Sequence, residues 1–335
     1  MFLLIGKLVR GEGLAIEFAL IYLILLGGIY VGWNIGANDA ANCIGTTVGA
    51  GLIRYWRAVT LVAVFAILGA LLQGHYVLKT IGKGIVAEEL PYLAVFIALF
   101  CAGFFVTIAT CLRIPVSTSQ AMVGGVVGIG LGVGADVDFS KFVTIAESWV
   151  ICPLLTMILS FGITHFLGSI LRRLKGSIIF VQNVMGWLAI LSGCYVAFSM
   201  GANNAGNAVG PIANLGIIHP RILVAIGGGA LALGAITFGR KVADTVGKGI
   251  TPLDLSGALA AQVSSAFGIH LFSLLGIPVS TSSAIVGAVA GTGLAKGART
   301  ISRKTILTIL IGWVLTPSLA GLSAFVLYRA VFYLE

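Results

Sequence analysis

Long apolar runs alternate with short polar or basic stretches along the whole chain. In the first half the runs lie at about 14–50, 56–78, 91–111, 114–134 and 141–171, and in the second at about 181–216, 221–239, 257–275, 277–295 and 305–333. Each is long enough to cross about 30 Å of hydrocarbon, allowing for tilt and breaks. The pattern predicts an all-α integral membrane protein with about ten to twelve transmembrane segments.

Two polar heptads interrupt the longest apolar runs. The first, Gly36–Asn42, reads Gly-Ala-Asn-Asp-Ala-Ala-Asn, and the second, Gly201–Asn207, reads Gly-Ala-Asn-Asn-Ala-Gly-Asn. Amides and a carboxylate at membrane depth are costly unless they line a cavity and hold a ligand. Breaks at matching places in two halves of a chain indicate a transporter's binding site. We therefore expect a broken helix, or a helix plus a re-entrant piece, around each heptad.

Further landmarks recur at nearly the same spacing of about 165 residues. Ile114–Ser119 returns unchanged as Ile277–Ser282, and Gly82–Ile85 returns as Gly247–Ile250. Trp149 with Pro153 recurs as Trp313 with Pro317. Matching polar and proline positions in one register indicate an internal duplication. We expect a first membrane repeat at 1–171, a cytoplasmic linker at 172–180 and a second membrane repeat at 181–335.

The charges of equivalent loops predict that the two repeats are inverted. The loop at 132–141 carries two aspartates, whereas its counterpart at 296–304 carries four basic residues. Positively charged loops stay in the cytoplasm, so equivalent loops of opposite charge belong on opposite sides of the membrane. An odd number of crossings in each repeat gives the same inversion. If the basic linker lies in the cytoplasm, both termini lie on the outer side of the cell membrane.

Composition excludes several classes of protein. The chain is 59% hydrophobic and 9% charged, whereas about a quarter of residues are charged in soluble domains. The net charge of +9 is spread over short loops, which argues against a nucleic-acid-binding face. No phosphate-binding loop, nucleophile–base pair or cluster of metal ligands stands out. We therefore expect no enzyme and no cofactor.

The polar residues suit two kinds of ligand. Oxygens from Asp39 and the asparagines, with freed backbone carbonyls, suit Na⁺. Hydroxyls and N–H groups at helix starts suit a tetrahedral oxyanion, and Pro115 and Pro278 precede two such starts. The alternative for each Ser-Thr-Ser run is a simple helix cap, but its duplication beside the heptads favours a shared site. Asp39 has no basic residue in its own segment to pair with, so a cation or a proton must neutralise it.

The paired heptads and paired Pro-Val-Ser-Thr elements resemble those of the inorganic phosphate transporter (PiT) family. The resemblance covers nearly the whole chain and implies symport of phosphate with a cation, usually Na⁺ and in some bacterial members H⁺. Two departures stand out. Asn204 occupies a position that is often Asp in the family, so one carboxylate is missing, and Val64–Ile67 lacks the acidic residue that longer relatives carry.

The resemblance also implies roles for individual residues. Donors to phosphate would be Asn42, Asn207, Thr118, Ser119, Gln120, Thr281, Ser282 and Ser283. Ligands of Na⁺ would be Asp39, Asn38, Asn203, Asn204, Ser117 and Ser280. We expect a secondary transporter that imports phosphate by alternating access at a site between two inverted repeats. The alternatives are an H⁺-coupled carrier, a carrier of another oxyanion such as sulfate, and an anion channel. The expected partners are the lipid bilayer and a second copy of the chain.

Overall fold

Helices make up almost all of the structure. The computed structural model describes residues 14–49, 51–111, 116–173, 177–249, 254–297 and 303–333. The elements in these ranges are α2 (Leu14–Gly49), α3 (Tyr55–Lys79), a π-helical turn η1 (Thr80–Gly84), α4 (Tyr92–Cys111), α5 (Thr118–Val133), α6 (Phe139–Arg173), α7 (Ile178–Asn214), α8 (Pro220–Gly249), α9 (Leu255–Leu274), α10 (Thr281–Ala295) and α11 (Arg303–Tyr333). The predicted all-α fold is confirmed.

Large apolar side chains cover the outer surface. Leu72, Ile158, Leu191 and Val314, from four different helices, are each more than half exposed. An exposed apolar surface of this extent indicates contact with lipid. Seven of the described helices are long and apolar enough to cross a membrane: α2, α3, α6, α7, α8, α9 and α11.

The predicted breaks within the heptads are absent. Gly36–Asn42 lies inside the continuous helix α2, and Gly201–Asn207 lies inside α7. The two glycines serve close packing instead of a break. A Cβ atom added at Gly36 would lie 1.9 Å from Leu231 O of α8, and one at Gly201 would lie 1.9 Å from Ala66 O of α3. Because the heptads keep their helical hydrogen bonds, they free no backbone carbonyl for a cation.

The irregular backbone lies elsewhere, in two helical hairpins. α5 and α10 have 16 and 15 residues, or roughly 24 Å and 22 Å at 1.5 Å per residue, which is less than the hydrocarbon thickness. Contacts between α9 and α10 run antiparallel, since Ser265 Oγ reaches Ala284 O near the tip and Asp254 pairs with Lys296 at the open end. The helices in runs 114–134 and 277–295 are therefore shorter than the full crossings that we expected.

The two repeats pack on each other through pairs of equivalent contacts. The contact of Gly36 with Leu231 and that of Gly201 with Ala66 are equivalent under the 165-residue offset. In the same manner, Gly124 of α5 packs on Pro317 of α11, and Gly287 of α10 packs on Pro153 of α6. Each contact joins one repeat to the other, so neither half packs as an independent unit.

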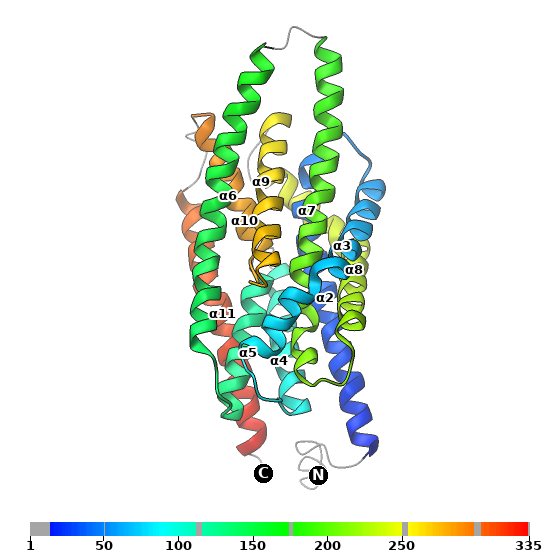
Figure 1. The fold of residues 1–335 in the computed structure, drawn as a ribbon, viewed down its shortest axis with the longest axis vertical. Coiled ribbons are helices and arrows are strands. Elements are labelled where there is room, and N and C mark those ends of the chain that lie inside the picture. Colours follow the sequence, from blue (N-terminus) through cyan, green and yellow to red (C-terminus); the bar gives the residue numbers. More distant parts are fainter. Residues whose placement is uncertain are drawn as a thin grey trace.

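Equivalent helices of the two repeats run in opposite directions. In Figure 1, α2 ascends from the end of the molecule where the N-terminus is marked, while α7 descends. Likewise α6 ascends and its counterpart α11 descends. This is the inverted arrangement that the loop charges predicted. Pro115, residues 174–176 of the linker and residues 298–302 of the basic loop lie outside the described residues, so the repeat boundaries stay a prediction.

Candidate functional site

The two hairpins and the two heptads meet in the interior of the protein. Ser119 Oγ in the first turn of α5 donates to Val279 O, just before α10, at 2.8 Å. Val279 in turn is held by Asn203 of the second heptad, whose Nδ2 lies 2.6 Å from Val279 O. The starts of α5 and α10 are therefore adjacent, and both lie beside α7. Helix N-termini carry unpaired N–H groups and a partial positive charge, which favours an anion.

Serine side chains set where both short helices begin. Ser117 Oγ accepts a hydrogen bond from Gln120 N at 3.2 Å, and Ser280 Oγ accepts one from Ser283 N at 3.1 Å. Both serines have extended backbone angles, as N-cap residues do. Both serines therefore cap their helices, which is the alternative that we considered for the Ser-Thr-Ser runs. Ser280 Oγ also accepts a second hydrogen bond, from Ser283 Oγ at 2.9 Å. The role of Ser117 and Ser280 as Na⁺ ligands stays a prediction.

Asp39 lies in the interior without a basic partner. Its side chain is 1% exposed. Asn204 Nδ2 donates to one carboxylate oxygen at 2.8 Å, and Ser282 Oγ donates to the other at 3.4 Å. Among the described residues, no Lys, Arg or His forms an ion pair with it. Neutral donors alone do not compensate a full buried charge. The carboxylate therefore needs a bound cation or a proton.

Two asparagines bond serines of the opposite repeat. Asn42 Nδ2 donates to Ser282 Oγ at 3.3 Å, and Asn207 Nδ2 donates to Ser119 Oγ at 2.8 Å. Asn42 and Asn207 are equivalent positions of the two heptads, as Ser119 and Ser282 are of the Ser-Thr elements. The site is therefore composite, with each half completed by a residue of the other repeat.

Asn204 connects the residues expected at phosphate with those expected at Na⁺. Its Nδ2 also lies 3.2 Å from Thr281 Oγ1, and its Oδ1 accepts from Asn203 Nδ2 at 2.8 Å and from Asn207 Nδ2 at 3.1 Å. Members of both predicted ligand sets therefore share one hydrogen-bonded cluster, which comprises Asp39, Asn42, Ser119, Asn203, Asn204, Asn207, Thr281 and Ser282. Ser117, Ser280 and Ser283 instead form hydrogen bonds within the first turns of the two short helices. Asn203 Oδ1 also accepts a hydrogen bond from Val279 N at 3.2 Å, so the Asn203 amide fixes the tip of the α9–α10 hairpin. Asn38, the equivalent residue of the first heptad, is buried beside Asp39.

Some buried polar atoms at this site have no partner in the described protein. Both amide atoms of Gln120 and Oδ1 of Asn207 make no hydrogen bond, although both side chains are fully buried. Such groups are rare because each one costs about 1–3 kcal/mol. They lie in the first turn of α5 and beside it, with Thr118 and Ser283 buried in the same turns of the two short helices. Of these three atoms, Gln120 Nε2 is a donor and suits an anionic ligand, whereas Gln120 Oε1 and Asn207 Oδ1 are acceptors and suit a cation or another donor.

Two tyrosines on the heptad helices contact the first arms of the hairpins, and the motif patterns did not indicate them. The Tyr30 hydroxyl contacts the Thr107 hydroxyl, and the Tyr195 hydroxyl lies 2.8 Å from His270 Nδ1. Tyr30 and Tyr195 are 165 residues apart, and Thr107 and His270 are 163 apart. Each pair joins a heptad helix to the first arm of a hairpin. Their recurrence at the heptad offset was the signal that would have found them.

Comparison with known proteins gives consistent results. Residues 35–324 match the Phosphate transporter family. A Chlamydia muridarum protein named "Putative phosphate permease" is 31% identical, with 93% of this chain and 99% of that protein covered. The chloroplastic inorganic phosphate transporter 2-1 of Arabidopsis thaliana is 28% identical, over 96% of this chain and 74% of its own. A solved structure named "The sodium-dependent phosphate transporter" superposes with a TM-score of 0.84 at 28% identity, covering 94% of this chain and 99% of that one.

Proposed function

This chain belongs to the phosphate transporter family, and we propose that it is a symporter that imports inorganic phosphate together with Na⁺. The observation that carries the proposal is the composite cluster around Asp39. In it, amide and hydroxyl donors from both repeats converge at the starts of two short helices, next to one carboxylate that has no basic partner among the described residues. That combination suits an anion and a cation bound together.

The phosphate is held by neutral donors. Asn42, Asn207 and Gln120 offer amide N–H groups, and Ser119, Thr118, Thr281, Ser282 and Ser283 offer hydroxyls or first-turn N–H groups. Neutral donors bind an oxyanion less tightly than arginine would, which suits a carrier that must release its substrate. The unpaired amide of Gln120 is the group with the most hydrogen-bonding capacity left.

The cation has an electrostatic role. Phosphate beside Asp39 would place at least two negative charges in a low-dielectric interior, at a cost of many kcal/mol. A Na⁺ ion bound to the Asp39 carboxylate, with the Asn38, Asn203, Asn204, Ser117 and Ser280 oxygens as further candidate ligands, offsets that charge. Neither ion then binds well alone, and this dependence couples their transport. The related solved structure is named as a sodium-dependent transporter, which supports the choice of cation.

Alternating access follows from the two groups of helices around the site. α2, α3, α7 and α8 pack through glycine contacts with backbone atoms, which gives a rigid bundle. The short arms α5 and α10 pack on α11 and α6, again through glycines, whereas the first arms α4 and α9 also contact α2 and α7. We propose that these two groups rock about the site to open it to each side in turn. Both termini would lie outside the cell, and the protein would form a homodimer.

Uptake of radiolabelled phosphate into proteoliposomes tests the proposal. An inward Na⁺ gradient should drive concentrative uptake, and an inward H⁺ gradient without Na⁺ should not. Uptake that follows H⁺ instead would make Asp39 a proton carrier at the same site. If neither gradient drives phosphate uptake, the same assay with sulfate tests the alternative oxyanion. Passive flux without concentration of phosphate would indicate a channel.

A further inference from the structure

A second concave site lies on the outer surface, away from the transport site. It is a groove of about 910 Å³ between the segment Gly51–Leu61, at the start of α3, and the first turns of α7. None of the residues that line it belongs to the heptads or to the Ser-Thr elements. The groove therefore needs an explanation separate from the transport of phosphate.

The mouth of the groove suits an anion. Arg54 and Arg57 line it from one side, and Gln182 and Asn183 line it from the other. Neither guanidinium has an ion-pair partner in the described part of the chain, and no acidic residue lines the groove. Two unpaired guanidiniums with two amides nearby form a site for a phosphate-type group, because arginine binds such oxygens through paired N–H donors.

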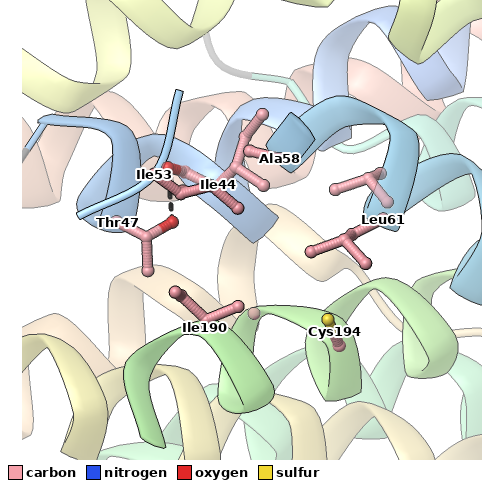
Figure 2. A pocket seen from close by; sticks show the side chains of 9 residues that line it. Ile44, Thr47, Ile53, Ala58, Leu61, Ile190 and Cys194 are labelled. Carbon is pink, nitrogen blue, oxygen red and sulfur yellow. Dashed lines mark hydrogen bonds between the residues drawn. The ribbon is translucent and has the colours of Figure 1, made fainter. Parts of the chain in front are cut away.

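The floor of the groove is apolar. Ile53, Leu61 and Ile190 line the groove and also a small pocket behind it, of about 10 Å³, which Figure 2 shows from close by. Ile44, Val62 and Cys194 continue that pocket. Its one hydroxyl, Thr47 Oγ1, donates to Ile44 O at 3.1 Å, as the dashed line in Figure 2 marks. The pocket therefore has room for roughly one methyl-sized group and favours an apolar one.

Two tryptophans place the groove at the level of the lipid headgroups. Trp56 and Trp187 line it and are 61% and 68% exposed. α3 and α7 run in parallel, since Gly186 lies near Leu52, Gly69 near Phe198, and Gly74 near Ala205. Beyond the tryptophans, both helices expose leucines, including Leu72 and Leu191. Tryptophan is enriched where apolar surface meets the headgroup region.

We propose that this groove binds one anionic phospholipid from the surrounding leaflet. Arg54 and Arg57 hold its phosphate, Gln182 and Asn183 contact the polar headgroup, and an acyl chain lies between Trp56 and Trp187 over the apolar floor. A lipid fits better than free phosphate because the cationic mouth and the apolar floor are continuous and open to the bilayer. Basic sites between transmembrane helices are known to suit such headgroups. The inner pocket involves α2 and α7, the helices that carry the heptads, so the bound lipid should stabilise their packing.

Native mass spectrometry and thermal melting of the full-length protein in neutral detergent test this site. Phosphatidylglycerol should bind with higher affinity than phosphatidylcholine and raise the melting temperature. The double variant Arg54→Gln/Arg57→Gln should lose at least about tenfold in affinity for phosphatidylglycerol, as expected for two charge-assisted contacts. The control variant Arg221→Gln/Arg329→Gln removes the same charge from exposed positions elsewhere and should bind like the wild type.

Three results would overturn the proposal. The first is equal phosphatidylglycerol binding by both double variants. The second is stabilisation by inorganic phosphate alone that is lost in Arg54→Gln/Arg57→Gln, because the groove would then be a site for the free ion. The third is a change in the mass of the protein–detergent complex in that variant without a change in lipid binding, because a second copy of the chain would then cover the groove. The double variant could lose lipid binding because it is less stable without lipid, so Trp187→Ala serves as a second variant. It keeps both arginines and should weaken the binding of phosphatidylglycerol and of phosphatidylcholine alike.

Discussion

Asp39 and Asn204 are equivalent residues of the two repeats, and they hydrogen-bond each other directly, with Asn204 Nδ2 2.8 Å from Asp39 Oδ2. An inverted repeat brings equivalent positions face to face at its pseudo-twofold axis. Two carboxylates at this distance would repel each other, whereas an amide and a carboxylate attract. An amide at position 204 therefore pairs with Asp39 and leaves a single carboxylate at this place.

Substituting Asp39 tests the role of the single carboxylate. Asp39→Asn keeps an oxygen that can accept from Asn204 but removes the charge that binds the cation. We expect Na⁺-driven phosphate uptake to fall roughly ten- to a hundredfold, from the loss of about 1.5–3 kcal/mol of charge-assisted contact, with the melting temperature unchanged or higher. Glu147→Gln, at an exposed position of α6, is the matched control. An equal loss of folded protein and of uptake would assign Asp39 a structural role.

Introducing a second carboxylate at position 204 should change the coupling ratio. In Asn204→Asp, two adjacent carboxylates can be accommodated only if a further cation or a proton enters with the substrate. We expect one more cation to move per phosphate, which reversal potentials in proteoliposomes measure directly. The variant should also melt at a lower temperature without Na⁺ than with it. A coupling ratio equal to that of the wild type would mean that residue 204 does not set the number of ions.

Gln120 should show opposite effects on stability and on affinity. Gln120→Leu removes two buried polar atoms that make no hydrogen bond in the described protein and replaces them with apolar groups of similar size. Folding should become more favourable by up to about 1–3 kcal/mol, while KM for phosphate should rise about tenfold. Melting curves and uptake kinetics on the same preparation measure both. A decrease in stability together with an unchanged KM would show that the amide serves the fold.

The heptad glycines should tolerate no side chain. Gly36→Ala or Gly201→Ala places a Cβ atom 1.9 Å from a backbone oxygen of the neighbouring helix, and backbone atoms cannot move aside cheaply. We expect a loss of about 1–3 kcal/mol of stability from overpacking. Gly229→Ala is the control, since nothing lies within 4 Å of its added Cβ, and there alanine should be neutral or stabilising. Similar melting temperatures for Gly36→Ala and Gly229→Ala would contradict this packing.

The open end of the α9–α10 hairpin should contribute to the pH dependence of stability. Asp254 caps α9 through Gly257 N at 2.8 Å and pairs with Lys296. Partial burial acts to raise the pKa of Asp254, but the bonds from Lys296 and Gly257 outweigh it and hold that pKa below its ordinary value. A carboxyl with a lowered pKa stabilises the fold above its unfolded-state pKa, near 3.9, and that contribution is lost as the pH falls through the folded-state value.

Melting of Asp254→Ala against the wild type measures this contribution. At pH 7 the variant should lose about 1 kcal/mol, mainly the value of the cap, because the ion pair is exposed and adds little. The difference should shrink below pH 4, where the wild-type carboxyl becomes protonated. A difference that does not change with pH would mean that the charge of Asp254 is not involved.

The sequence by itself determined the membrane class, the duplication and the identity of the residues at the centre. The apolar runs and the paired motifs depend on local composition and on spacing, which the sequence carries directly. The inversion was also predictable, because loop charge depends on the side of the membrane and not on packing. The two heptads and the two Ser-Thr elements were expected to share one site, and in the structure they form one cluster.

Only the tertiary structure decided where the backbone is irregular and which atoms pair. A broken helix or a re-entrant piece was expected around each heptad. Both heptads are instead continuous helix. Gly36 and Gly201 lie where a neighbouring helix approaches so closely that only glycine fits, and the sequence does not show how close another helix comes. The pairing of Asp39 with Asn204, and of Asn42 and Asn207 with serines of the opposite repeat, depends on contacts between residues far apart in the chain. Such contacts arise from the packing of the two repeats on each other, which no local pattern encodes.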